Sequence, residues 1–134
     1  MLKALPILGE IDQFVVINSD IWTDYPMHKL LRANLNAHIV LAPKSSSENG
    51  DFDLHEGIVK TSNSPPFVFT GIASYKASSF KNMIVEKKKL GPVLRLWAEQ
   101  KKLSGEIYQG KWFDIGTTEK LRIAKGEIKK TIKD

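Results

Sequence analysis

The hydrophobic residues of this chain gather into short unbroken runs that end at small polar or glycine-containing turns. The clearest run, Phe14 to Ile17, stops at Asn18-Ser19-Asp20, and similar runs cover residues 37–42 and 67–75. A short apolar run without alternation predicts a strand buried on both faces, as in a parallel sheet packed between helices. Ligands of such sheets bind beyond the carboxyl ends of the strands, so Asp20 lies where α/β enzymes carry their chemistry.

Apolar residues at helical spacing separate these predicted strands. Met27, Leu30 and Leu31 keep that spacing, and Asp24 before Tyr25-Pro26 is a helix start signal, so we expect an amphipathic helix from Pro26 to Asn34. The pattern as a whole predicts an α/β fold with a mixed sheet. The remaining expected elements are a helix end or turn at Lys3–Leu8, strands at Gln13–Asn18, Ala37–Ala42, Phe67–Tyr75, Glu106–Gln109 and Trp112–Phe113, a hairpin from Asp51–Leu54 and Ile58–Lys60, a helical turn at Ala77–Phe80, and helices at Pro92–Lys102 and from Thr117 onward.

Length and composition fit an ordinary globular domain. The chain has 134 residues, of which 42% are hydrophobic and 26% charged, so we expect one domain spanning residues 1–134. It contains no cysteine, no apolar run long enough to cross a membrane and no signal-peptide pattern, which favours a cytoplasmic location. The net charge of +5 comes from lysines interspersed with glutamates. This distribution is typical of solvated helix surfaces rather than of nucleic-acid binding, which would interleave aromatic residues.

A second carboxylate, Asp114, follows an apolar pair late in the chain, much as Asp20 follows the first strand. From the pattern alone the two aspartates are either metal ligands or turn and capping residues. Gly71, in the middle of a predicted strand, marks either a bulge or a close approach of a ligand. The three histidines have no metal-ligand spacing, and His38, inside an apolar strand, is expected to be a packed core residue.

Several motifs in a characteristic order make the sequence recognisable. The chain resembles the sugar-1-phosphate nucleotidyltransferases, and within them the N-acetylmuramate-1-phosphate uridylyltransferase and mannose-1-phosphate guanylyltransferase-like branch. The resemblance is carried by Val16-Ile17-Asn18-Ser19-Asp20-Ile21-Trp22-Thr23-Asp24, Gly50-Asp51-Phe52, Phe69-Thr70-Gly71-Ile72, Leu103 to Lys111 and Trp112-Phe113-Asp114-Ile115-Gly116-Thr117.

The resemblance implies the carboxy-terminal part of a Rossmann-like nucleotidyltransferase fold. Members of the family begin with a strand and a glycine-rich loop, carrying Arg and then Lys, that hold the nucleotide phosphates, and no such element occurs in this sequence. The missing strand is central in the family sheet, so we expect an exposed strand edge, plausibly at residues 14–17. Such an edge predicts aggregation, a strand-swapped homodimer or completion by a separate amino-terminal fragment.

The family reaction transfers a nucleotidyl group from a nucleoside triphosphate, here UTP or GTP, to a sugar-1-phosphate and releases pyrophosphate. By resemblance, Asp20 and Asp114 are the catalytic, Mg²⁺-binding aspartates, since Mg²⁺ takes one or two carboxylates plus phosphate oxygens. We expect no partner among nucleic acids or membranes and no turnover by this chain alone. The alternative function is a non-catalytic remnant or interaction module. The resemblance also implies substrate contacts by Asn18, Asp51, Thr70, Gly71 and Glu106. Three of these residues have an alternative interpretation: Asp51 as a turn residue, Gly71 as a bulge, and Glu106 as a strand glutamate without a role.

Overall fold

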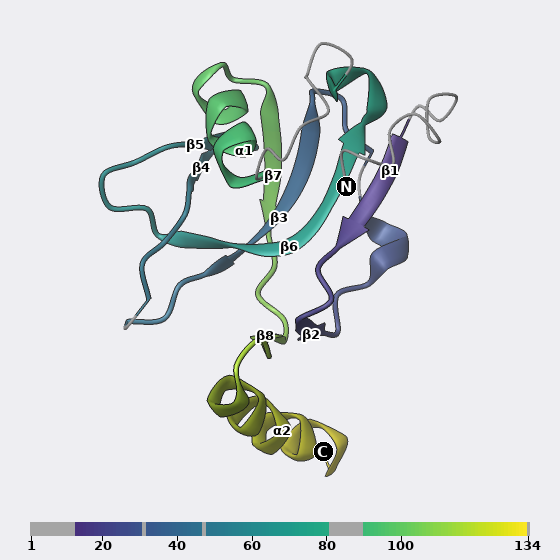
Figure 1. Cartoon of the computed structure of the whole chain (residues 1–134), viewed down its shortest axis with the longest axis vertical. Coiled ribbons are helices and arrows are strands. Elements are labelled where there is room, and N and C mark those ends of the chain that lie inside the picture. The colour runs from purple at the N-terminus through teal and green to yellow at the C-terminus, as the bar shows by residue number, and fades with distance from the viewer. Residues whose placement is uncertain (1–12, 31, 47, 81–89, 134) are drawn as a thin grey trace.

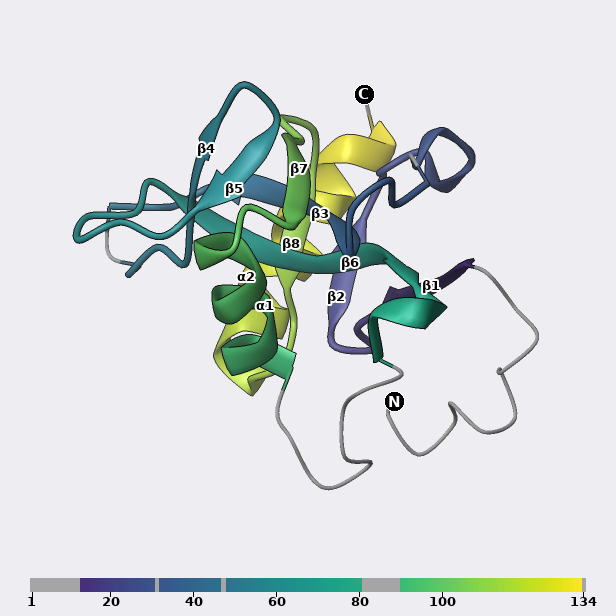
Figure 2. The same cartoon turned by 90° about the horizontal axis from the view of Figure 1, so that it is seen from above.

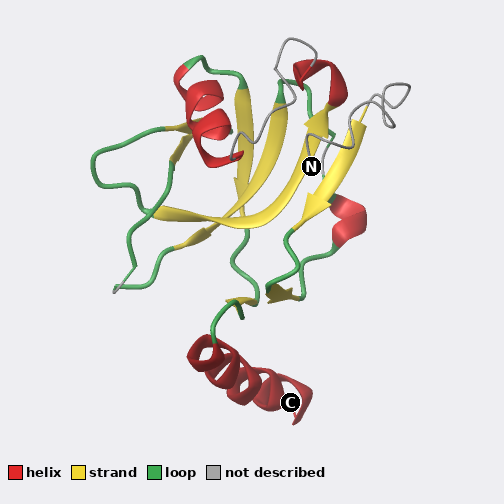
Figure 3. Ribbon diagram, in the orientation of Figure 1, coloured by secondary structure: helices red, strands yellow, loops and turns green. Residues whose placement is uncertain are grey.

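The computed structural model describes residues 13–30, 32–46, 48–80 and 90–133 (Figure 1), and the turn or helix end expected at Lys3–Leu8 lies outside them. Figure 3 colours helices, strands and loops separately. The strands are β1 (Gln13–Ile17), β2 (Ile21–Thr23), β3 (Ala37–Pro43), β4 (Asp53–His55), β5 (Ile58–Lys60), β6 (Phe67–Lys76), β7 (Leu103–Ile107) and β8 (Trp112–Asp114). The helices are the 3₁₀ turns η2 (Met27–Lys29) and η3 (Ala77–Phe80) and the α-helices α1 (Leu90–Glu99) and α2 (Thr118–Lys133).

Six of the described strands form one mixed sheet, in the order β1-β6-β3-β7-β5-β4. The β3–β7 pair is parallel, whereas β1 and β3 both run antiparallel to β6. A separate ribbon of β2 and β8 lies below this sheet in Figure 1 and leads into α2. The prediction of an α/β fold with a mixed sheet is therefore confirmed.

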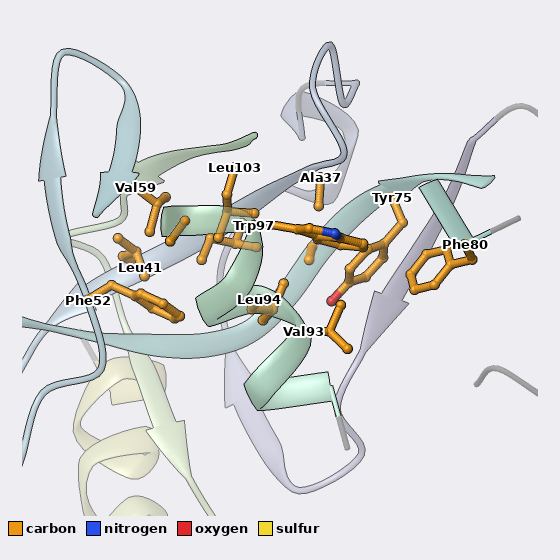
Figure 4. Packing of buried hydrophobic residues seen from close by; sticks show 13 residues of the cluster. Ala37, Leu41, Phe52, Val59, Tyr75, Phe80, Val93, Leu94, Trp97 and Leu103 are labelled. Carbon is orange, nitrogen blue, oxygen red and sulfur yellow. The ribbon is translucent and has the colours of Figure 1, made fainter. Parts of the chain in front are cut away.

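The main core lies between α1 and one face of the sheet (Figures 2 and 4). The amphipathic pattern of α1 directs Val93, Leu94 and Trp97 onto Ile39 and Leu41 of β3, all of them buried. The opposite face carries a smaller apolar cluster of Tyr25, Val40 and Ile72. Because successive strand residues point to opposite faces, one strand such as β3 supplies side chains to both clusters.

The first strand differs from its prediction. β1 lies at the edge of the sheet and pairs only with β6 among the described strands. Its residues Val15 and Ile17 are 55% and 47% exposed, so the expectation of a strand buried on both faces was wrong. An apolar run reports the character of the side chains, whereas edge or central placement depends on which other strands are present.

The helix expected from Pro26 to Asn34 was also wrong in extent. Only Met27–Lys29 form a 3₁₀ turn, because Leu30 already has an extended backbone with ψ of 123°. Asp24 makes no capping hydrogen bond to this turn, contrary to its expected role as a helix cap. Its carboxylate instead accepts hydrogen bonds from the Tyr108 hydroxyl and the Lys111 backbone N–H.

Other predicted elements are present with small shifts. The β4–β5 hairpin turns at Glu56-Gly57, both with positive φ, and the helical turn at residues 77–80 is η3. The strand expected at Glu106–Gln109 starts earlier, because β7 covers Leu103–Ile107. Within the part of the chain that the structure describes, neither α-helix combines the length and apolar character needed to cross a bilayer.

Candidate functional site

The β2–β8 ribbon brings the two predicted metal-binding aspartates together. Asp20 immediately precedes β2, Asp114 is the last residue of β8, and Asp114 pairs with Ile21. The Ile115 N–H also donates to the Asp20 carbonyl at 2.8 Å. A Cβ placed on Gly116 would lie 3.0 Å from Asp20 Oδ2 and 3.1 Å from Asp114 Oδ1. Both carboxylates therefore border the same small space, which the absence of a side chain at Gly116 leaves open.

Each oxygen of the Asp114 carboxylate has a partner. Oδ1 accepts the Gly116 N–H at 2.8 Å, and Oδ2 accepts Lys120 Nζ of α2 at 2.8 Å. The hydrogen bond from Lys120 holds the pKa of Asp114 below its usual range, and the Gly116 N–H adds to this effect against the opposing effect of burial. In turn, Asp114 raises the pKa of Lys120, with smaller contributions from Glu48 and Asp20. The Asp114 carboxylate and the Lys120 ammonium therefore form an ion pair at the edge of the site.

A hollow of about 210 Å³ adjoins the two aspartates. Its walls come from the ends of β1 and β8, the loop before β4 and the middle of β6. The lining residues are Asn18, Asp20, Ile21, Glu48, Asn49, Asp51, Val68, Phe69, Thr70, Trp112 and Asp114. Five predicted site residues, distant in sequence, therefore line one hollow.

Gly71 does not itself line this hollow, but it contacts Asn18, which does. Gly71 has φ of +87° and lies where the β3–β6 register shifts between Ile39 and Leu41, which is a bulge. The Asn18 N–H donates to the Gly71 carbonyl at 3.0 Å, and the Asn18 side chain fills the place of a Cβ on Gly71. The bulge interpretation of Gly71 therefore describes its backbone, and the glycine makes room for Asn18.

Asp51 and Thr70 are fixed by backbone hydrogen bonds. Asp51 Oδ2 accepts the Phe69 N–H at 2.8 Å, which ties the loop before β4 to β6. The Thr70 hydroxyl donates to the Val40 carbonyl at 2.8 Å, and the Trp112 indole N–H donates to the Thr70 carbonyl at 2.9 Å. These bonds hold the walls of the hollow together across β3, β6 and β8.

Like Gly71, Glu106 does not line the hollow with the five predicted site residues that do. Its Oε1 accepts the Tyr25 hydroxyl at 2.7 Å and lies 3.1 Å from His38 Nε2, whose other ring nitrogen lies 3.0 Å from Ser104 Oγ. His38 is 4% exposed, so it is a buried residue as expected, but within a polar network. Burial and the Glu106 hydrogen bond raise the pKa of Tyr25. A separate hollow of about 330 Å³ borders His38 and Ser104.

Sequence reasoning missed several residues at the hollow. Glu48 and Asn49 belong to a polar loop that carried no motif, and Trp112, although part of a recognised motif, was not among the predicted site residues. Lys120 lies in a lysine-rich helix whose charges were interpreted as solvated surface. No local signal distinguishes Lys120 from its neighbours, because its role depends on the position of Asp114 in space.

The donor chemistry of the hollow fits a hard divalent cation. Four carboxylates line it, from Asp20, Glu48, Asp51 and Asp114, and oxygen ligands are those that Mg²⁺ prefers. No group of three or more His, Cys, Asp or Glu residues within the described ranges is arranged to enclose a metal ion. The arrangement matches a site in which two carboxylates hold the ion and phosphate oxygens or water complete its shell.

Comparisons with known proteins identify relatives of the chain. It is 30% identical over 133 residues to the N-acetylmuramate alpha-1-phosphate uridylyltransferase of Neisseria meningitidis serogroup B, covering 91% of this chain and 57% of that protein. The fold matches the inositol-1-phosphate CTP transferase from T. maritima with a TM-score of 0.74 at 15% identity, covering 99% of this chain and 60% of that one. A Bacillus anthracis protein assigned as a glucose-1-phosphate thymidylyltransferase, crystallised with sucrose, matches with a TM-score of 0.69 at 17% identity, over 92% and 58%.

No protein-family model matches the chain. The chain spans somewhat more than half the length of the relatives it matches. Sequence and fold agree on one assignment, and the resemblance carried by the motifs is confirmed. The chain is thus related to the sugar-1-phosphate nucleotidyltransferases, over part of the length of those proteins.

Proposed function

We propose that this chain provides the divalent-metal and sugar-phosphate half of a nucleotidyltransferase site. The reaction is Mg²⁺-dependent transfer of a nucleotidyl group from UTP or GTP to a sugar-1-phosphate, with release of pyrophosphate. The observation that carries the proposal is the approach of the Asp20 and Asp114 carboxylates to one space beside Gly116. We propose a cytoplasmic location, where nucleoside triphosphates are available.

Electrostatics explain why the hollow needs a cation. Its eleven lining residues include four carboxylates and no lysine or arginine, and Lys120 at its rim pairs with only one of the four, so the hollow repels a phosphate group until further positive charge is supplied. Asp20 and Asp114 would hold Mg²⁺ there. When bound, such an ion neutralises phosphate charge and polarises the phosphoryl group that is attacked.

The other residues of the hollow position the substrate in this proposal. Asn18, Asp51 and Thr70 line it, and Gly71, next to Thr70, leaves room for the Asn18 side chain. Glu106 does not contact the substrate directly in this proposal, because its carboxylate is hydrogen-bonded to Tyr25 and His38 and does not line the hollow. A sugar ring would therefore meet Asn18, Asp51 and the Thr70–Gly71 backbone before it meets Glu106.

Binding of Mn²⁺, followed by electron paramagnetic resonance, tests the metal assignment without requiring turnover. Asp20→Asn and Asp114→Asn should each weaken Mn²⁺ binding by at least about tenfold, because a charged ligand is lost. The matched control is Asp53→Asn, which removes a carboxylate of β4 that does not line the hollow. Equal Mn²⁺ affinity in the wild type and both site variants would overturn the proposal.

The alternative, a non-catalytic module that keeps the fold, makes a different prediction for the same titration. A remnant without a working site should show Mn²⁺ binding that does not depend on Asp20 or Asp114. Turnover is followed separately, as pyrophosphate release from each nucleotide with a sugar-1-phosphate. We expect none from the chain alone, because the sequence carries no glycine-rich loop to hold the nucleotide phosphates.

We also propose that the outer edge of β1 is the surface through which this chain associates with another polypeptide. Val15 and Ile17 are exposed there, and β1 pairs with β6 alone among the described strands. The free side of an apolar edge strand favours pairing with a further strand. The proposed partner is a second copy of the chain; light scattering of the purified chain should show a dimer, and a stable monomer would overturn this assignment.

A further inference from the structure

The ammonium group of Lys120 holds one oxygen of the Asp114 carboxylate, whose other oxygen borders the space shared with Asp20. Its Nζ is 2.8 Å from Asp114 Oδ2, on a side chain that is 54% exposed. The remaining Asp114 oxygen, Oδ1, accepts the Gly116 N–H and borders the space shared with Asp20. One carboxylate cannot give both oxygens freely to a metal ion while these two partners are in place.

The surroundings of Lys120 explain why it rests there. The pKa of Lys120 is raised mainly by its hydrogen bond to Asp114, and more weakly by the charges of Glu48 and Asp20. All three carboxylates line the hollow. The first turn of α2 fixes the backbone of Lys120, whose N–H donates to Thr117 Oγ1 at 3.1 Å. The flexible side chain thus projects one positive charge to the rim of an otherwise negative hollow.

We propose that Lys120 is an internal counter-ion of Asp114 that competes with a divalent cation for the charge of its carboxylate. The inference rests on the proposed function of the hollow as a metal site. The ion pair is solvent-exposed and made by a long side chain, so it is readily broken. Once displaced, the ammonium remains tethered to α2 at the rim of the hollow, where it can pair with a substrate phosphate oxygen. Lys120 is therefore a positioning residue that keeps positive charge at the site with and without metal.

The test compares Mn²⁺ affinities of the full chain and of Lys120 variants by electron paramagnetic resonance. Lys120→Gln should bind Mn²⁺ about two- to fivefold more tightly than the wild type, because no ion pair is broken on binding. Lys120→Arg keeps the charge and should stay within about twofold of the wild type. Lys125→Gln removes another exposed lysine of α2 and controls for the loss of one charge from the helix.

The outcomes separate this inference from the proposed function. The inference is supported if Lys120→Gln binds Mn²⁺ more tightly than the wild type while Lys120→Arg and Lys125→Gln keep the wild-type affinity. A merely structural role of Lys120 would weaken Mn²⁺ binding in Lys120→Gln instead. Mn²⁺ binding that depends on Asp114 but is unchanged or weaker in Lys120→Gln overturns the counter-ion role alone. Absence of Mn²⁺ binding in the wild type and in Lys120→Gln overturns both proposals.

Discussion

Replacing Gly71 by alanine should destabilise the protein in two separable ways. The first is backbone strain, because Gly71 has φ of +87° and an L-residue in that region costs about 1–2 kcal/mol. The second is overlap, since the new Cβ would lie 2.5 Å from Asn18 Nδ2 and 2.9 Å from Asn18 Cβ. Overpacking of this kind costs about 1–3 kcal/mol. The expected loss in the free energy of unfolding is therefore about 2–5 kcal/mol.

The chain contains a matched control at Gly57. Its φ is +80°, close to that of Gly71, but a Cβ there would meet no atom within 4 Å. Gly57→Ala should therefore show the backbone cost alone, about 1–2 kcal/mol. The stabilising effect of alanine on the unfolded chain applies to both variants and cancels in the comparison.

Urea unfolding followed by tryptophan fluorescence measures both variants. A double-mutant cycle of Gly71→Ala with Asn18→Gly then isolates the contact, because Asn18→Gly removes the three atoms nearest to the new Cβ. We expect a favourable coupling of about 1–2 kcal/mol between the two changes. Equal losses at Gly71 and Gly57, or a coupling near zero, would refute the placement of the Asn18 side chain against Gly71.

Three further predictions concern other contacts. Glu106→Ala should lower the free energy of unfolding in urea by about 1–3 kcal/mol, because it removes the acceptor of the Tyr25 hydroxyl. Glu106→Gln should lower it less, and equal losses in the two variants would contradict this role of Glu106. The pKa of Asp114, followed by carboxyl ¹³C shifts, should lie below about 3.9 and rise toward it in Lys120→Gln. Stability from this ion pair is present at neutral pH and lost as the pH falls through that lowered pKa, and an unshifted titration would disprove the pairing. Val15→Lys should reduce self-association measured by light scattering, and an unchanged mass of an associated species would exclude the β1 edge as the interface.

The sequence determined the local elements and the chemistry of the site residues. Unbroken apolar runs located β3 and β6, and glycine in the middle of a strand marked the bulge at Gly71. Asp20 and Asp114 were recognisable because motifs around them resemble a known family. These features are encoded by neighbouring residues, so one chain without a structure is enough to read them.

Only the tertiary structure decided what depends on residues far apart in the chain. The apolar composition of β1 is typical of a central strand; the family resemblance predicted an exposed edge near residues 14–17, and the strand order places β1 at the edge of the sheet. Lys120 is only six residues from Asp114, but it resembles every other lysine of α2 until the path of the turn between β8 and α2 places its Nζ 2.8 Å from that carboxylate. Periodicity records whether a side chain prefers burial, whereas pairing partners and ionic contacts are fixed only when the whole chain folds.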